Sequence, residues 1–165
     1  MVRDTTDVVI IGAGAAGLMC AIEAGRRGRR VIVLEHNAQI GRKILISGGG
    51  RCNFTNRHTT AENFVSANIH FAKSALARYT PRDFVAMVER HSIPYHEKTL
   101  GQLFCDRAAD EIVQMLVAEC AAAGVRIETA CRVNRVVGAF EVETSCGIFH
   151  CAALVIATAA CRFRK

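Results

Sequence analysis

The sequence has 165 residues, of which 51% are hydrophobic and none is Trp, so we expect one domain with an aliphatic core. The formal net charge is +6, but residues 1–60 carry nine Lys and Arg residues against four acids, and the remainder is nearly balanced. The densest basic run, residues 26–30, lies where a helix is expected to end, and the helix dipole favours cations there. Charge therefore argues against a nucleic-acid partner, and no apolar run is long enough to span a bilayer.

Residues 7–35 predict a strand, a glycine turn, a helix and a second strand. Residues 7–11 form a short, β-branched apolar run, which is typical of a strand buried on both faces. The helix is expected over residues 15–27 and ends at Gly28, a residue suited to a left-handed C-cap. The second strand follows at residues 31–34. This order is that of a Rossmann unit.

Four residues of this unit predict a dinucleotide ligand. Gly12, Gly14 and Gly17 have the spacing G-x-G-x-x-G, which permits a tight turn, close approach of a pyrophosphate and tight helix packing. Glu35 ends the second strand, where its carboxylate can accept hydrogen bonds from ribose hydroxyls and would repel a 2′-phosphate. The pyrophosphate is expected at the helix N-terminus, where free N–H groups favour an anion. The pattern favours FAD or NAD over NADP, and over a glycine turn without a ligand.

The cysteines and histidines predict neither a metal centre nor a catalytic dyad. The eight cysteines form no C-x-x-C pair, and the six histidines show no zinc-ligand spacing, so no metal is expected. No nucleophile–base pair can be assigned, so no catalytic residue is expected. Because a flavin or nicotinamide carries out redox chemistry itself, this does not argue against an oxidoreductase. Nothing indicates secretion, and free thiols in a reducing cytoplasm are expected.

The segment 41–56, GRKILISGGGRCNFTN, is the most distinctive part of the chain. Its glycines, cations and amides can wrap a phosphate or the polar edge of a heterocycle. With the first unit, it resembles the bacterial FAD-dependent oxidoreductases of the BaiN/YhiN-like (aminoacetone-oxidase-like) family, which belong to the two-dinucleotide-fold group related to glutathione reductase. The resemblance implies a Rossmann-like α/β fold that binds FAD, NAD(P)H as electron donor and an unidentified small-molecule substrate.

The resemblance also implies which residues bind the cofactor. The ADP half of FAD would contact Gly12, Ala13, Gly14, Ala15, Ala16, Gly17 and Glu35. The pyrophosphate, ribityl chain or flavin ring would lie against the flavin-side loop, residues 41–56, through Arg42, Lys43, Ser47, Gly48, Gly49, Gly50, Arg51, Cys52 and Asn53. The backbone at Val133 would contact adenine. A redox role for the Cys52 thiol is a further hypothesis, which requires a lowered pKa and exposure.

The rest of the chain predicts a helical segment over residues 61–123, a β-meander and a returning strand. Helices are expected over residues 71–79, from Pro81 onward, and from an N-cap at Asp106 to residue 123, with two short strands around Gly101. The meander is expected over residues 125–151, and the strand that rejoins the parallel sheet over residues 153–158.

The end of the chain departs from the family pattern. Ala159 and Ala160 stand where the family turn has glycines, and family members are more than twice as long. The resemblance therefore implies the N-terminal part, residues 1–165, of an FAD-binding domain, truncated or frame-shifted before the substrate domain and the C-terminal FAD segment. Three functions stay open: the FAD-binding portion of a flavin-dependent NAD(P)H oxidoreductase, a non-catalytic remnant, or a stand-alone NAD- or ADP-binding module. A chain of this length is not expected to be active alone.

Overall fold

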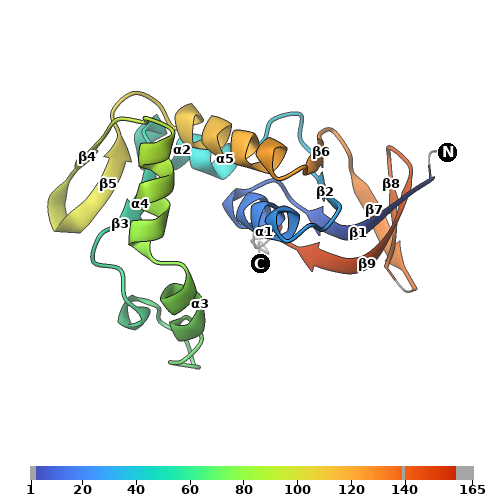
Figure 1. Cartoon of the computed structure of the whole chain (residues 1–165), viewed down its shortest axis with the longest axis horizontal. Helices are drawn as coiled ribbons and strands as arrows, with labels where there is room; N and C mark the ends of the chain where they lie inside the picture. The colour runs from blue at the N-terminus through green and yellow to red at the C-terminus, as the bar shows by residue number, and fades with distance from the viewer. Residues whose placement is uncertain (1–2, 139, 159–165) are drawn as a thin grey trace, which may run out of the picture. The chain divides into compact units, whose positions relative to one another are not determined.

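The computed structural model describes residues 3–138 and 140–158 (Figure 1). It divides the chain into two compact units. The described residues up to Lys43 and from Leu116 onward form the Rossmann unit, and Ile44–Met115 form the second unit. Ala159 and Ala160 lie outside the described residues. Among the described residues, no helix combines the length and the apolar character that a membrane crossing requires.

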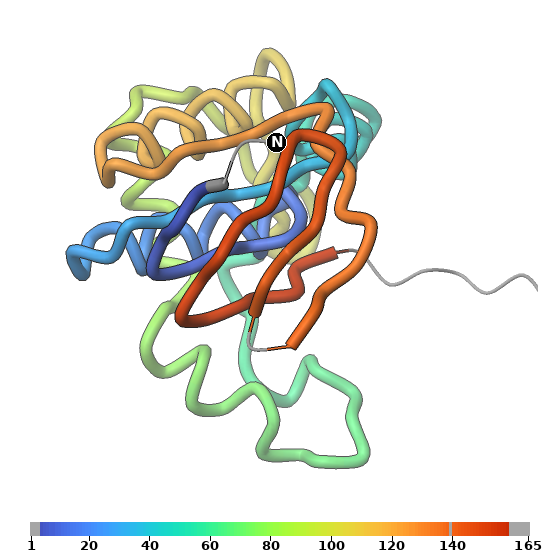
Figure 2. The backbone as a smooth tube through the Cα atoms, turned by 90° about the vertical axis from the view of Figure 1, so that its right-hand side faces the viewer, coloured from blue at the N-terminus to red at the C-terminus, as the bar shows by residue number. Residues whose placement is uncertain are grey.

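The Rossmann unit is built on a six-stranded sheet in the order β6-β2-β1-β9-β8-β7. The first four strands of this order are parallel, and β9, β8 and β7 are antiparallel neighbours. Figure 2 shows these last three strands, in orange and red, side by side. The bounds are β1 (Arg3–Ile11), β2 (Val31–Leu34), β6 (Arg126–Glu128), β7 (Val133–Val137), β8 (Glu141–Thr144) and β9 (Ile148–Ile156). This arrangement confirms the predicted Rossmann-like α/β fold with a small antiparallel part.

Strand β9 joins two strands that the sequence pattern separates. The last strand of the expected meander and the strand expected over residues 153–158 form one nine-residue strand. The first residues of β9 pair with β8. Along its whole length, β9 also pairs with β1, from Ile148 opposite Arg3 to Ile156 opposite Ile11. The physical reason is the length of β1, which begins at Arg3 and supplies a hydrogen-bonding edge along the whole of β9.

Helix α1 (Ala15–Arg26) packs its apolar face on this sheet, as the periodicity predicts. Leu18, Ala21 and Ile22 are completely buried. The helix ends where expected, with Gly28 in the left-handed conformation at φ 73°. A second cluster of buried side chains includes Val9, Ile32, Leu34, Cys131, Val142 and Phe149. The first βαβ unit therefore has the buried core that its sequence predicts.

The second unit contains a three-stranded antiparallel sheet in the order β3-β5-β4. Phe54 packs against Phe84 of helix α4 and edge-on against Tyr95, with ring centroids 6.0 and 5.6 Å apart. The strands are β3 (Asn53–Asn56), β4 (Tyr95–Glu97) and β5 (Gln102–Cys105). The helices are α3 (Lys73–Arg78) and α4 (Pro81–Arg90), with 3-10 turns η1 (Ser47–Gly50), η2 (Ala61–Asn63) and η3 (Thr99–Gly101). Helices α2 (Arg42–Ile46) and α5 (Asp110–Ala122) cross the boundary between the units.

Two local predictions in this region have different outcomes. Pro81 opens α4, and the preceding Thr80 forms a capping box with Asp83. Asp106, in contrast, is not the N-cap of α5, which begins at Asp110. The Asp106 carboxylate lies 2.6 Å from Nδ1 of His96. A partner brought close by the β4–β5 pairing has replaced the local cap.

Candidate dinucleotide site

The three glycines of the first turn have different surroundings. Gly12 has φ 109°, and a Cβ added there would lie 2.8 Å from the Ala157 carbonyl oxygen. A Cβ added at Gly17 would lie 1.9 Å from the Gly12 carbonyl oxygen, so α1 could not keep its place on the turn. At Gly14, no described atom lies within 4 Å of an added Cβ. Gly12 and Gly17 thus meet steric demands within the protein, and Gly14 leaves space beside the backbone for a ligand.

The N-terminus of α1 is open to an anion. Gly14 is the N-cap and has no side chain to satisfy the N–H groups of the first turn, which have no partner within a helix. Ala15 and Ala16 are exposed, and the first turn contains no acidic residue that would repel an anion. The positive end of the helix dipole adds to the attraction. This geometry suits a pyrophosphate.

Glu35 is buried beneath the glycine turn and only 7% exposed. Its Oε2 accepts a hydrogen bond from the Ala13 N–H at 2.9 Å, and its Oε1 accepts from the Asn37 N–H at 2.9 Å and from Nδ2 at 2.8 Å. Burial raises the pKa of the carboxyl, but these hydrogen bonds outweigh burial and leave the pKa lowered. Since each carboxylate oxygen has two lone pairs, Oε2 has capacity for a ribose hydroxyl.

Arg42 belongs to the same hydrogen-bonded network. Its Nη1 donates to the Oδ1 of Asn37 at 3.1 Å, and the N–H of the preceding Gly41 donates to the Ala13 carbonyl at 3.0 Å. The start of the flavin-side loop is therefore tied to the glycine turn. Lys43 is exposed beside Arg42. Both cations are available to an anionic ligand of this unit.

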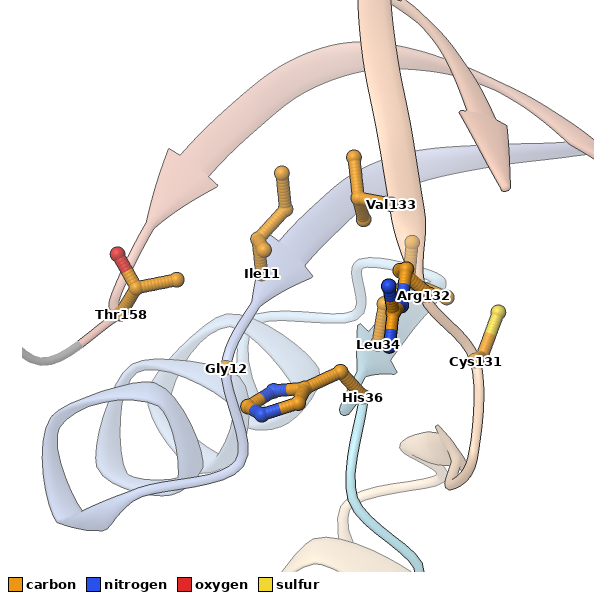
Figure 3. A pocket seen from close by; sticks show the side chains of 8 residues that line it. All are labelled: Ile11, Gly12, Leu34, His36, Cys131, Arg132, Val133 and Thr158. Carbon is orange, nitrogen blue, oxygen red and sulfur yellow. The ribbon is translucent and has the colours of Figure 1, made fainter. Parts of the chain in front are cut away.

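A pocket of about 220 Å³ opens at the carboxyl ends of β1 and β2. Figure 3 shows the Ile11, Leu34 and Val133 side chains around it, with Cys131 where the chain approaches β7. The full lining is Ile11, Gly12, Leu34, His36, Cys131, Arg132, Val133 and Thr158. Pockets for whole drug-sized ligands measure roughly 300–1,000 Å³, so this one suits one part of a dinucleotide.

Gly12 and Val133 are the two predicted site residues that line this pocket, and Glu35 lies beside it without lining it. The other lining residues were not predicted from the sequence. Leu34 and His36 flank Glu35, and strand alternation could have placed them together on the opposite side of the chain from its carboxylate. Cys131 and Arg132 follow β6 in a segment without any motif, so no local pattern marked them.

The remainder of the flavin-side loop lies in the second unit. Gly48, Gly49 and Gly50 all have positive φ, from 58° to 86°. Gly48 is pressed against the Phe104 ring, where an added Cβ would approach to 2.7 Å, whereas added Cβ atoms at Gly49 and Gly50 meet no described atom within 4 Å. The exposed Arg51 follows them. The loop thus offers open backbone and a cation.

The other side chains of this loop serve its own folding. Ser47 Oγ donates to the Ile44 carbonyl at 2.8 Å, and the Asn53 side-chain nitrogen donates to the Thr55 and Leu103 carbonyls at 3.1 and 3.3 Å. Cys52 is buried, and burial raises the pKa of its thiol. A buried protonated thiol does not favour the redox role considered for Cys52.

Within the described part of the chain, no group of three His, Cys, Asp or Glu side chains is placed to hold a metal ion.

The predicted cofactor-binding residues fall into two groups. The second unit contains Ser47 to Asn53. The Rossmann unit contains the others, which are Gly12 to Gly17, Glu35, Arg42, Lys43 and Val133.

Comparisons with known proteins agree on the fold and the family. The model for the HI0933-like protein Rossmann domain matches residues 6–163. The chain is 49% identical over 155 residues to the ribosomal RNA dihydrouridine synthase of Escherichia coli, covering 92% of this chain, and 46% identical over 157 residues to that of Haemophilus influenzae, covering 91%. It spans 39% of the length of each of these relatives. The crystal structure of a 3-ketosteroid dehydrogenase from Rhodococcus jostii shares the fold, with a TM-score of 0.68, 17% identity, and coverage of 95% of this chain and 46% of that one.

Proposed function

The chain belongs to the family of HI0933-like proteins with a Rossmann domain, and we propose that it is the FAD-binding portion of a flavin-dependent oxidoreductase. The observation that carries the proposal is Glu35. Its lowered pKa keeps the carboxylate ionised, and its Oε2 has capacity for a further donor beside the Gly12–Gly17 turn. A buried carboxylate at this position suits the hydroxyls of an adenosine ribose and repels a 2′-phosphate.

The surrounding residues support the same orientation of the ligand. The open N-terminus of α1 would hold the pyrophosphate, and the pocket between Leu34 and Val133 would take the adenine. The flavin-side loop, with its exposed Arg51 and open glycines, would lie against the ribityl chain or the flavin. When bound, FAD would supply hydride transfer, and Arg42, Lys43 and Arg51 would stabilise negative charge on the cofactor.

For the whole protein, we propose a reductase that acts on uridine in ribosomal RNA. The support is the identity of 49% and 46% to two ribosomal RNA dihydrouridine synthases. Formation of dihydrouridine adds two hydrogen atoms to a carbon–carbon double bond, which is a reduction suited to a flavin with NAD(P)H as donor. This substrate differs from the small molecule that the resemblance implies, and it runs against the expectation from the charge distribution that no nucleic acid binds. The residues that would contact RNA can lie in the 61% of those relatives that this chain does not match.

The cofactor part of the proposal is tested by binding. The purified chain is incubated with FAD, passed through gel filtration and examined for protein-bound flavin absorbance. Titrations with FAD, NAD and ADP then compare the dissociation constants. FAD binding tighter than that of NAD and ADP supports the proposal, because only FAD carries a flavin ring in addition to the ADP half. Equal affinity for the three ligands would favour the stand-alone NAD- or ADP-binding module, and binding of none would favour the non-catalytic remnant.

The substrate part needs a full-length family protein that carries this sequence as its N-terminal portion. It is incubated with NADPH and ribosomal RNA that lacks dihydrouridine, and the digested RNA is analysed by mass spectrometry. A uridine that gains two hydrogen atoms supports the proposal. Oxidation of NADPH with no change in the RNA, and reduction of a small conjugated ketone instead, would refute it.

A further inference from the structure

The wall of the pocket contains a cysteine that the fold brings close to a second one. Cys131 lines the pocket and is only 1% exposed to solvent. Cys146 is exposed in the turn that joins β8 to β9. Both thiols are free in the structure. The two residues differ in exposure but belong to the same hairpin region of the Rossmann unit.

The strand register brings the segments that contain the two cysteines together. In the β7–β8 pair, Val133 lies opposite Thr144. One step further, the Arg132 N–H donates to Ser145 Oγ and the Ser145 N–H donates to the Arg132 carbonyl, both at 2.9 Å. Cys131 directly precedes this bonded pair, and Cys146 directly follows it in the turn after β8. The two cysteines therefore flank one pair of residues that are hydrogen-bonded to each other, and a disulfide needs Cβ atoms roughly 3.5–4.5 Å apart.

A shared hydroxyl provides an independent sign of this proximity. The Cys131 thiol donates to Thr144 Oγ1 at 3.4 Å, and the Cys146 N–H donates to the same oxygen at 3.0 Å. The pKa of the Cys131 thiol is raised, chiefly by burial and further by the neighbouring Cys146 side chain, while the Thr144 hydroxyl acts in the opposite direction. The Cys131 thiol and the Cys146 backbone therefore meet at one hydroxyl, which places the two residues close together.

We propose that Cys131 and Cys146 form a peroxide-responsive disulfide in the pocket wall, and that its formation weakens binding of the adenosine end of the cofactor. The second half rests on the proposed function. Hydrogen peroxide oxidises the exposed Cys146 thiolate to a sulfenic acid and is reduced to water. The Cys131 sulfur then displaces a second water and forms the disulfide. The two sulfurs lose two electrons in total, and a dithiol reductant restores both thiols.

The link to the pocket comes from the position of Cys131. Its side chain packs in the buried cluster with Leu34, and its N–H donates to the Glu35 carbonyl at 2.9 Å. Turning its sulfur toward Cys146 removes packing from the pocket wall and strains the segment that leads to Val133. Leu34 and Val133 line the pocket together with Cys131, so formation of the disulfide changes the shape of the pocket.

Other cysteines of the chain are poorer targets for peroxide. Burial raises the pKa of Cys105 to about 12 and that of Cys120 to about 11, so these thiols stay protonated at neutral pH. Cys146 differs because it is exposed. The first oxidation is therefore expected at Cys146, with Cys131 as the thiol that resolves it.

The modification is tested on the full chain without any ligand. The reduced protein is treated with hydrogen peroxide, alkylated, digested and analysed by mass spectrometry for a peptide that joins Cys131 to Cys146. In Cys131→Ser, the sulfenic acid on Cys146 should persist and react with dimedone. Cys151→Ser is the matched control, because the Cys151 thiol donates to a backbone carbonyl, and it should form the disulfide normally. Absence of the joined peptide in the wild type would overturn the proposal.

The effect on the pocket is measured by titrating ADP into reduced and oxidised protein. We expect several-fold weaker binding after oxidation, reversed by dithiothreitol. Cys146→Ser should bind ADP like the reduced wild type and lose its sensitivity to peroxide. Unchanged ADP affinity in protein that carries the disulfide would overturn the link to the pocket. If the reduced chain binds neither ADP nor FAD, the proposed function fails, whereas the peptide result still decides whether the disulfide forms.

Discussion

Replacing Glu35 by Ala removes the acceptor of two backbone N–H groups and should affect both folding and ligand binding. Ala13 is completely buried, and its N–H loses the Glu35 carboxylate that accepts its hydrogen bond at 2.9 Å. Asn37 is only half-buried, so its donors can bond to water instead. An unsatisfied buried donor costs about 1–3 kcal/mol, and we expect the free energy of unfolding to fall by that amount.

The loss of binding should be of similar size. A hydrogen bond from a ribose hydroxyl to a charged acceptor contributes about 1.5–3 kcal/mol, so the dissociation constants of FAD and ADP should rise roughly 10- to 150-fold. Glu35→Gln keeps one acceptor oxygen and should lose less. It should also bind 2′-phosphorylated ADP better relative to ADP, because the charge that repels the 2′-phosphate is gone.

The assay combines urea unfolding followed by circular dichroism with calorimetric titration of ADP and FAD. Glu128→Ala is the control, since this carboxylate is on the neighbouring strand and forms a surface ion pair with Arg126. Surface pairs contribute about 0–1 kcal/mol, so little change is expected. A folded Glu35→Ala protein with wild-type affinity for ADP would show that the carboxylate does not contact the ribose.

Three further predictions concern the same unit. Gly17→Ala should lower the free energy of unfolding by about 1–3 kcal/mol in urea melts, because its Cβ would overlap the Gly12 carbonyl. Gly14→Ala should unfold like the wild type yet bind FAD more weakly. A Gly14→Ala protein that is less stable than Gly17→Ala would contradict the roles assigned to the two glycines. Thr144→Val removes a hydroxyl that accepts from two backbone N–H groups and donates to the Gly147 carbonyl, so a loss of about 1–3 kcal/mol is expected in the same assay. Because the pKa of Glu35 is lowered from 4.5, its stabilisation is complete above that pH and is lost as the pH falls through the folded-state value. The difference in unfolding free energy between wild type and Glu35→Gln should accordingly shrink in acid, and a constant difference would refute this account.

The sequence by itself determined the parts whose causes lie within a few residues. The glycine spacing, the apolar face of α1 and the run at 31–34 predicted the first strand–helix–strand unit, and the structure has these elements with ends within a few residues of the expected ones. Pro81 likewise marked the start of α4. Helix periodicity and turn chemistry are local, so they can be read without the fold.

Only the tertiary structure decided which distant residues meet. Parallel pairing of β1 with β9 and of β2 with β6 brings Cys131 and Val133 to the pocket, nearly a hundred residues after Leu34. The pairing of β4 with β5 brings His96 close to Asp106, and Asp106 contacts this histidine instead of capping α5. Such contacts depend on strand order and register, which no short window of sequence contains. The glycine turn and its carboxylate were therefore predictable from the sequence, whereas the place of Cys131 in the pocket wall and the approach of Cys146 to it were not.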